Sequence, residues 1–207
     1  MQALQNNEVP PAAKKRLIQL HSVLKGFEKE RITSQEIKAL TGWTDSTIRH
    51  DFWLIGFGKG ASNGYKTEEL KTEISRYFGL EEEAFQEAKK LCIVGLNRLG
   101  AALLDEGFFE GSGFVIKAGF DSNLYRVEIL RSTFPLYPAT QMEFVIKKEG
   151  IEYAVLTSDA KNAQMLAEKL ANAGIRGIVN MTCSVLKVPP EVKVEDISIL
   201  NALKLIR

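Results

Sequence analysis

The chain of 207 residues is 45% hydrophobic, which allows one large domain or two small ones with real cores. It has neither a run of about 18 apolar residues nor a secretory signal, and its two cysteines are too few for a disulfide scaffold or a zinc finger, so a cytoplasmic protein is expected. The net charge is only +1, but residues 10–66 carry ten Lys and Arg against five Asp and Glu, which is compatible with a nucleic-acid face.

Two helices are predicted in the first part of this basic region. The first begins after Pro10 and Pro11, because proline is well placed at a helix start. Its apolar side chains recur every three or four residues, at Leu17, Leu20, Leu24 and Phe27. The second begins at a capping box, in which the Thr33 hydroxyl accepts the amide of Glu36 and the Glu36 carboxylate reaches back.

A third helix is predicted to follow a turn at Gly42, with Thr44 or Asp45 as its cap. Two short helices joined by a glycine-containing turn make a helix-turn-helix. The apolar positions that can pack inward are Ile48, Phe52 and Ile55. The polar side chains left near the N-terminal end, where a recognition helix meets base edges, are Ser46, Thr47, Arg49 and His50. The alternative is a small helical bundle with a solvated polar face.

The segment after the third helix is rich in glycine and favours the DNA-binding interpretation over the bundle. Asn63 and Gly64 are a hairpin signal, and a hairpin directly after a recognition helix is a wing. Lys59 and Lys66 would then bring positive charge beside the DNA backbone. We therefore predict a winged helix over about residues 10–66.

The rest of the chain has the pattern of an α/β domain. Thr67 is expected to cap a linking helix that ends at Gly79. Beyond it, apolar runs typical of buried parallel strands occur at residues 91–94, 114–120, 151–157 and 175–180, with a helix over 159–173. Strands alternating with helices indicate a parallel sheet with right-handed crossovers. We predict a winged-helix DNA-binding domain with a linker helix over residues 1–79 and a Rossmann-like dinucleotide-binding domain over 80–207.

A last helix is predicted over about residues 198–206. Its apolar side chains lie at positions 199, 200, 203, 205 and 206, and they call for a partner surface. We expect this helix to serve dimerisation.

The turn between the first strand and helix of the α/β domain is the candidate cofactor site. It comprises Gly95, Leu96, Asn97, Arg98, Leu99 and Gly100, and it has two of the three glycines of a dinucleotide fingerprint. Asn97 takes the middle position, where the backbone approaches the pyrophosphate. Asp121 follows about 20 residues later at a strand end, where an acid binds the ribose hydroxyls of NAD. The alternative is a tight turn with no ligand.

The sequence gives little support for a catalytic site. The histidines are His21 and His50, and neither has the setting of a catalytic triad or of a metal site. Cys92 lies inside a buried strand and is interpreted as core. Cys183 follows a strand end without a neighbouring base, which favours an inert thiol over a reactive one. We expect no enzyme and no metal site.

Several short motifs are spread along nearly the whole chain: VP at 9–10, KRL at 15–17, STIRHDF at 46–52, FGK at 57–59, GY at 64–65, AGFD at 118–121, AVLT at 154–157 and AGIRGIVN at 173–180. Together they resemble the motifs of the Rex family of redox-sensing transcriptional repressors. The resemblance implies a cytoplasmic homodimer that binds a palindromic operator. NADH would close the dimer and release DNA, NAD+ would compete, and the C-terminal helix would exchange between subunits.

The departures from the family pattern gather at the ligand site. Asn97 replaces a glycine, Ser158 and Asp159 replace Val-Pro, residues 181–183 replace Phe-Ala-Pro, and Ser198 replaces an acid. We expect a DNA-binding repressor that responds to NADH and NAD+ through a partly degenerate site with weakened NAD(H) binding. The alternative is a nucleotide-binding or CoA-binding Rossmann protein, either a binding protein or an enzyme, in which the winged helix serves only dimerisation.

Overall fold

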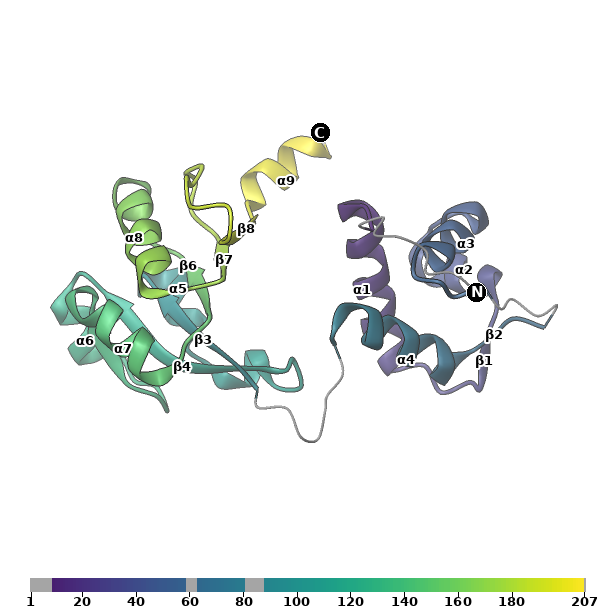
Figure 1. Ribbon diagram of the computed structural model, residues 1–207, viewed down its shortest axis with the longest axis horizontal. Coiled ribbons are helices and arrows are strands. Elements are labelled where there is room, and N and C mark those ends of the chain that lie inside the picture. The colour runs from purple at the N-terminus through teal and green to yellow at the C-terminus, as the bar shows by residue number, and fades with distance from the viewer. Residues whose placement is uncertain (1–8, 59–62, 81–87, 207) are drawn as a thin grey trace. The chain divides into compact units, whose positions relative to one another are not determined.

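The computed structural model describes residues 9–58, 63–80 and 88–206, which fold as two compact units, Met1–Glu83 and Ala84–Arg207 (Figure 1). The elements of the first unit are α1 (Pro11–Lys25), β1 (Arg31–Ile32), α2 (Ser34–Thr41), α3 (Asp45–Leu54), β2 (Tyr65–Lys66) and α4 (Thr67–Phe78). The three helices expected before residue 55 are confirmed. In the first unit α1 packs on α4, and α2 and α3 form the helix-turn-helix.

Side-chain caps fix where α2 and α3 begin. The capping box between Thr33 and Glu36 is confirmed, since each side chain bonds the other's backbone amide. A hydrogen bond from Lys29, followed by those from Thr33, lowers the pKa of Glu36 to about 2, so the carboxylate that holds the cap persists well into the acid range. Thr44 caps α3 through the amide of Thr47.

One local expectation is wrong. Thr67 does not cap α4, because its hydroxyl donates instead to the carbonyl of Lys29, 2.7 Å away, and so joins α4 to the segment before β1. The hairpin expected at Asn63 and Gly64 stays a prediction, because residues 59–62 lie outside the described residues; among the described strands, β2 pairs antiparallel with β1. Gly64 is required here, since its φ of 90° is left-handed and a Cβ there would lie 2.7 Å from the carbonyl oxygen of Ile32.

Apolar side chains from every helix of the first unit meet in one core. The buried members include Leu17, Leu20, Leu24, Ile37, Ile48, Phe52, Ile55, Leu70 and Ile74. The inward positions expected for α3 are therefore confirmed. Phe52 meets Tyr65 of β2 edge to face, with ring centroids 4.9 Å apart, so the helix-turn-helix and the two-stranded sheet share this core.

One ion pair at the edge of this core ties α1 to the recognition helix α3. Asp51 is buried, with 2% of its surface exposed, and both its oxygens accept from Arg16, at 2.6 and 2.8 Å. The hydrogen bond to Asp51 raises the pKa of Arg16 above its ordinary value. Such a bidentate pair fixes orientation as well as charge.

The second unit is a six-stranded parallel sheet in the order β5-β4-β3-β6-β7-β8. The strands are β3 (Lys89–Val94), β4 (Phe114–Asp121), β5 (Leu136–Pro138), β6 (Tyr153–Leu156), β7 (Gly177–Asn180) and β8 (Lys193–Asp196). The helices are α5 (Arg98–Ala102), α6 (Leu124–Ile129), α7 (Met142–Glu149), α8 (Ala160–Ala173) and α9 (Ile199–Leu205), with 3₁₀ turns η1 (Glu106–Phe109) and η2 (Ala139–Gln141). Strand order reverses between β3 and β6, which is the switch point of a Rossmann sheet. The expected fold class is confirmed.

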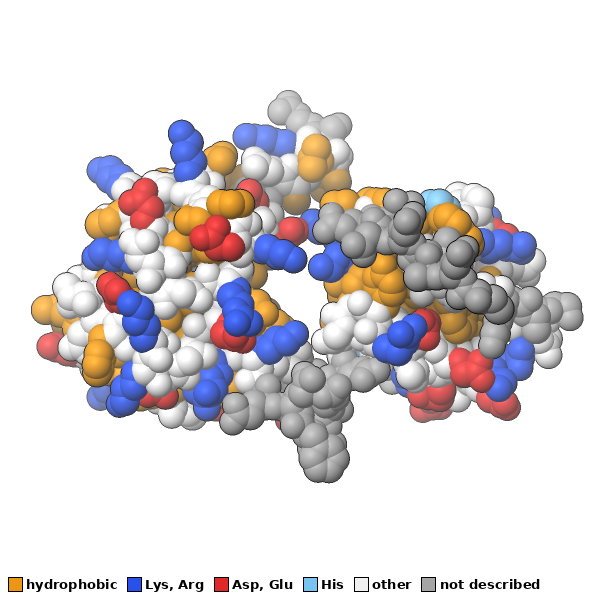
Figure 2. All heavy atoms as spheres, in the orientation of Figure 1, with side chains coloured by type: hydrophobic (Ala, Val, Ile, Leu, Met, Phe, Trp, Pro, Cys, Tyr) orange, Lys and Arg blue, Asp and Glu red, His pale blue; other side chains and the backbone are white. Residues whose placement is uncertain are grey.

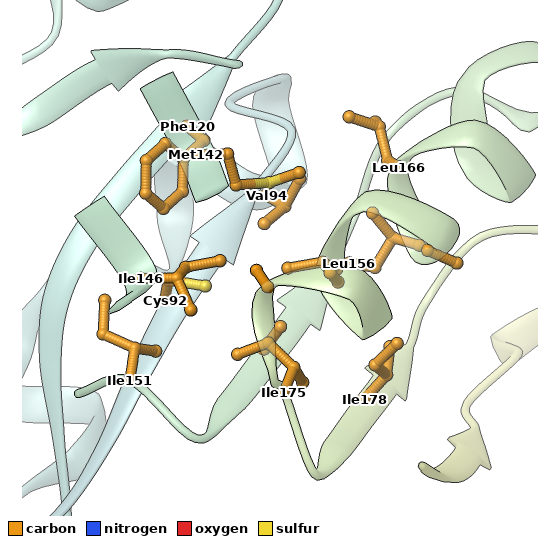
Figure 3. Packing of buried hydrophobic residues seen from close by; sticks show 14 of the residues in the cluster. Cys92, Val94, Phe120, Met142, Ile146, Ile151, Leu156, Leu166, Ile175 and Ile178 are labelled. Atoms are coloured by element: carbon orange, nitrogen blue, oxygen red, sulfur yellow. The ribbon is translucent and has the colours of Figure 1, made fainter. Parts of the chain in front are cut away.

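Alternate residues of the central strands pack on opposite faces of the sheet. Cys92 and Val94 join a core under α7 and α8 (Figure 3), whereas Leu91 and Ile93 face a second cluster with Leu96. Burial raises the pKa of the Cys92 thiol, so it stays protonated as a core residue. Cys183 is exposed.

The C-terminal helix α9 lies close to its predicted place, with Ser198 as its cap. All its large apolar side chains are exposed in the single chain: Ile199, Leu200, Leu203 and Leu205, followed by Ile206. Over the described residues, no helix is both long and apolar enough to cross a membrane. On the face of the second unit drawn in Figure 2, cationic and anionic side chains are interspersed rather than gathered into one patch.

Candidate functional site

The exposed face of α3 carries the side chains predicted to read DNA. Ser46, Arg49 and His50 lie on one face of the helix, because they are three and four residues apart, while Ile48 and Phe52 point into the core. Trp53, the next position on the same face, is also exposed. The helix therefore offers solvent a continuous stripe of one hydroxyl, one guanidinium and two rings.

The hydroxyls at the start of α3 form a small cluster around the cap. Thr44 Oγ1 lies 2.9 Å from Ser46 Oγ and 2.8 Å from Thr47 Oγ1. The cluster fixes the rotamers of Ser46 and Thr47 and leaves each oxygen with further hydrogen-bonding capacity. The two predicted groove residues are thus held at the N-terminal end of the recognition helix.

Two of the cations predicted to contact DNA, Arg49 and Lys66, are paired with acids at the surface. Arg49 Nε lies 2.8 Å from Asp45 Oδ2, and Lys66 Nζ lies 2.6 Å from Glu69 Oε1. Exposed pairs of this kind contribute about 0.2–1 kcal/mol, so a phosphate can take the place of the carboxylate at little cost. Lys59, the other predicted backbone contact, lies outside the described residues.

A groove of about 890 Å³ runs beside the exposed face of α3. Its lining includes Ser34, Gln35 and Lys38 of α2, Arg49 and Trp53 of α3, and Phe57 after it. Gly64 also lines the groove, and Arg31 holds this segment by donating to Asn63 Oδ1 at 2.9 Å and to the Gly64 carbonyl at 3.0 Å. Side chains from α2, α3 and the segment before β2 thus border one concave surface.

The glycines of the 95–100 loop are needed by the fold itself. Gly95 has a φ of 94°, and a Cβ there would lie 2.6 Å from the amide nitrogen of Ser158. A Cβ on Gly100 would lie 1.8 Å from the carbonyl oxygen of Gly95. The first glycine makes the turn and the last lets α5 pack on the strand, as expected.

Asn97 occupies the backbone amides that a phosphate would use. Its Oδ1 accepts from the amides of Leu99 and Gly100, each at 3.0 Å, and its Nδ2 donates to the carbonyl of Thr157. Two of the three amides over residues 98–100, which the start of a helix otherwise leaves free, are therefore occupied. Asn97 itself has φ −67° and ψ −172°, extended backbone that any residue adopts.

Asp121 is turned toward the same loop. It is 5% exposed, its Oδ2 accepts from the Leu96 amide at 2.6 Å and from Arg126 at 3.3 Å, and its Oδ1 accepts from the Asn123 amide at 2.7 Å. A carboxylate has about four lone-pair sites, so little capacity is left for a ribose hydroxyl. The predicted ribose acid thus serves first to hold the loop.

A cavity of about 290 Å³ opens at the carboxyl ends of β3, β4 and β6. Three of the predicted cofactor residues, Gly95, Asn97 and Asp121, line this cavity. The other four do not: Leu96 is buried, Arg98 and Leu99 are exposed to solvent, and Gly100 packs against Gly95. Further residues lining the cavity are Asn123, Arg126, Ser158, Asp159 and Asn162.

The residues of this cavity fit the pyrophosphate of a dinucleotide less well than the residues of a three-glycine loop would. Two of the loop amides are capped by Asn97. Asp121 and Asp159 add negative charge to the cavity, and Arg126 lies within hydrogen-bonding reach of one of them. Among the described residues, no group of His, Cys, Asp and Glu side chains is placed to hold a metal ion.

Sequence reasoning missed Trp53, Thr157 and Arg126. Thr157 is buried at the end of β6, and its hydroxyl donates to the carbonyl of Gly95, which could not be inferred without the topology that joins them. Trp53 was visible as a large aromatic residue one turn after Arg49 and His50 on the helix face predicted to be exposed. Arg126 follows Asp121 closely enough in sequence to have been noticed.

Similarity to known proteins extends over nearly the whole chain. Residues 8–52 match the family described as putative DNA-binding protein N-terminus, and residues 86–184 match the CoA binding domain family. The redox-sensing transcriptional repressor Rex of Limosilactobacillus reuteri (strain DSM 20016) is 31% identical over 202 residues, which cover 96% of this chain and 92% of the relative.

Two solved structures of RSP, a Rex-family repressor, are similar in fold and sequence. RSP in complex with beta-NAD+ and operator DNA is 30% identical, with a TM-score of 0.84 over 97% of this chain and 92% of RSP. RSP in complex with beta-NADH is 29% identical, with a TM-score of 0.80 over 99% of this chain and 93% of RSP.

Proposed function

The chain belongs to the Rex family of redox-sensing transcriptional repressors, and from this premise we propose that it is a cytoplasmic DNA-binding repressor rather than an enzyme. The winged-helix domain with its linker helix, residues 1–79, would bind a palindromic operator. The Rossmann-like domain, residues 80–207, would bind the effector. The observation that carries the proposal is the exposed face of α3, on which Ser46, Arg49 and His50 lie together beside an open groove.

We propose that the side chains divide between reading bases and holding the backbone. Ser46, Thr47, Arg49 and His50 lie on or beside the exposed face in the first half of α3, which is the part of a recognition helix that meets base edges. Lys66, together with Lys59, would contact phosphates. Release of counterions by these cations makes affinity fall as salt rises.

Replacing Arg49 with alanine is expected to weaken binding to the specific operator by about 1–3 kcal/mol, with a smaller loss on random DNA. The reason is that a guanidinium in the groove recognises a base edge, whereas a phosphate contact is indifferent to sequence. Electrophoretic mobility shift with a palindromic library, followed by titration of the selected site, measures both affinities. Lys169→Ala, an exposed charge removed from α8 of the other unit, is the matched control. An equal loss on both DNAs would assign Arg49 to the phosphate backbone.

We propose NAD(H) as the effector, bound more weakly than by a three-glycine loop and with little preference between its redox forms. The support is the family membership, the RSP complexes with beta-NAD+ and beta-NADH, and the Rossmann switch point beside the cavity. The capped amides and the carboxylates lower the expected affinity. The match to the CoA binding domain family keeps a CoA-type nucleotide as the second candidate.

The protein is expected to be a homodimer through α9. Five large apolar side chains over residues 199–206 are exposed in the single chain, and burying them requires a partner surface. Sedimentation at micromolar concentration should give twice the mass of the chain. The double substitution Leu200→Glu and Leu203→Glu should give a monomer that binds a two-half-site operator weakly. A wild-type monomer under these conditions would rule out the dimer.

A further inference from the structure

We propose that Trp53 is a DNA contact in the last turn of the recognition helix. Its ring would pack on a deoxyribose, and its Nε1–H would donate to a phosphate oxygen at the edge of the major groove. The inference rests on the proposed DNA-binding function and adds to it a neutral contact with the backbone. Trp53 is not among the residues predicted from the sequence to bind DNA.

The exposure of Trp53 is the first observation. Its surface is 59% exposed although Phe52, its neighbour in sequence, is buried in the core of the unit. Trp43, the second tryptophan of the chain, is half-buried and packs against that same core. Tryptophan is enriched where proteins meet partners, because its large ring gains much from burial and its N–H still finds an acceptor.

The position of Trp53 points to DNA as the partner. Trp53 lies on the same face of α3 as Arg49 and His50, and with Arg49 it lines the groove that we assign to the operator. The rings of His50 and Trp53 stack, with centroids 5.9 Å apart and planes 19° from parallel. The stacking restricts the rotamers of both side chains, so less conformational entropy is lost on binding.

The position of Trp53 along α3 places it near the sugar-phosphate backbone of DNA rather than near the base edges. Recognition helices bring their N-terminal residues to base edges. Trp53 comes seven residues after Ser46, about 10 Å further along the axis at 1.5 Å per residue. At that distance the side chain reaches the rim of the groove, where sugars and phosphates lie. An indole offers both an apolar face for the sugar and a donor for the phosphate.

A neutral backbone contact predicts a particular pattern in binding measurements. Trp53→Ala should weaken binding to operator and to random DNA by the same factor, about five- to tenfold. The dependence of affinity on salt should keep its slope, because no counterion is released by a neutral side chain. Lys66→Ala is the matched comparison, since losing a charged contact should reduce the slope by about 0.9. Trp53→Phe, which keeps a ring and removes the N–H, should recover part of the loss.

Three outcomes of these titrations would overturn the inference. Unchanged affinity for Trp53→Ala would leave the exposed ring without a role in DNA binding, and a loss confined to the operator would make it a base contact. Wild-type protein that binds no duplex DNA would overturn both this inference and the proposed function. Either of the first two outcomes, with Arg49-dependent binding intact, would overturn this inference alone. Because Trp53 is exposed, thermal unfolding of its variants should match that of the wild type, which separates binding from folding.

Tryptophan fluorescence gives an independent test in the whole protein. Trp43→Phe leaves Trp53 as the sole tryptophan, and adding duplex DNA should quench and shift its emission as the ring leaves water. The matched variant Trp53→Phe reports from Trp43, whose emission should change much less because that ring already packs on the core. Unchanged Trp53 emission at a DNA concentration that saturates the mobility shift would contradict the contact. Capture of the ring by a second copy instead would appear as a concentration-dependent shift without DNA.

Discussion

Asp51→Ala is expected to lower the free energy of unfolding by about 1–3 kcal/mol, the usual cost of leaving a partly buried hydrogen-bonding group without its partner. Asp51 is 2% exposed and accepts two hydrogen bonds from Arg16, whose charge would be left at the edge of the core. Urea denaturation followed by circular dichroism measures the change. The same substitution should weaken DNA binding, because the pair sets the position of α3 against α1.

Asp45 provides the matched control for Asp51, since both are acids on α3 that pair with an arginine. The pair between Asp45 and Arg49 is exposed, so Asp45→Ala should change the free energy of unfolding by less than about 1 kcal/mol. Replacing both Arg16 and Asp51 with apolar residues of similar volume should recover much of the loss, because no buried charge would then lack a partner. A loss below about 1 kcal/mol for Asp51→Ala would show that water or another side chain satisfies Arg16.

Asn97→Gly is expected to strengthen NADH binding by about ten- to a hundredfold. The substitution frees the amides of Leu99 and Gly100, and hydrogen bonds to a charged phosphate contribute about 1.5–3 kcal/mol each. It also removes a side-chain helix cap, which with glycine as the replacement costs only about 0.3 kcal/mol of stability. Isothermal titration calorimetry with NADH, NAD+, ATP and CoA, on wild type and variant, measures the affinities. For the wild type we expect weak NADH binding with little preference over NAD+, and adenosine-containing fragments that retain much of the affinity.

Asn97→Ala distinguishes the two ways in which Asn97 could oppose the pyrophosphate. Alanine frees the same amides and fits the extended backbone at this position, but it keeps a Cβ. If capped amides are the obstacle, alanine should give most of the gain, and if close approach of the backbone is required, only glycine should. Tight wild-type binding of NADH with strong discrimination against NAD+ would contradict the account of this site, as would an unchanged affinity in Asn97→Gly.

Structural features that depend only on residues close together in the sequence could be predicted. The capping box of Thr33 and Glu36, the spacing of Ile48, Phe52 and Ile55, and the buried central strands each rest on period, burial or hydrogen bonds within a few residues. The alternation of strands with helices was enough to predict the Rossmann sheet. The short strands β1, β5 and β8 were not predicted, because two to four residues carry no periodicity of their own.

Side-chain roles that depend on a distant partner were not predictable. The hydroxyl of Thr67 donates to the carbonyl of Lys29 rather than capping its own helix. The carboxamide of Asn97 accepts from its own helix, and Asp121 accepts from the amide of Leu96 in the loop. In each case a local pattern suggested one hydrogen-bond partner, and the folded chain supplied another.

The close packing of Gly100 against Gly95 means that the positions of this loop differ in which amino acids they can accept. A methyl group at either glycine collides with backbone, so those residues are retained whatever the protein binds. Asn97 sits between them in a conformation open to most amino acids, so that position can drift as the ligand is modified or abandoned. Two glycines spaced five apart after a strand therefore report the geometry of the strand-to-helix turn and not its ligand. The residue at position 97, whose side chain occupies the amides of Leu99 and Gly100, is the one that informs on the ligand.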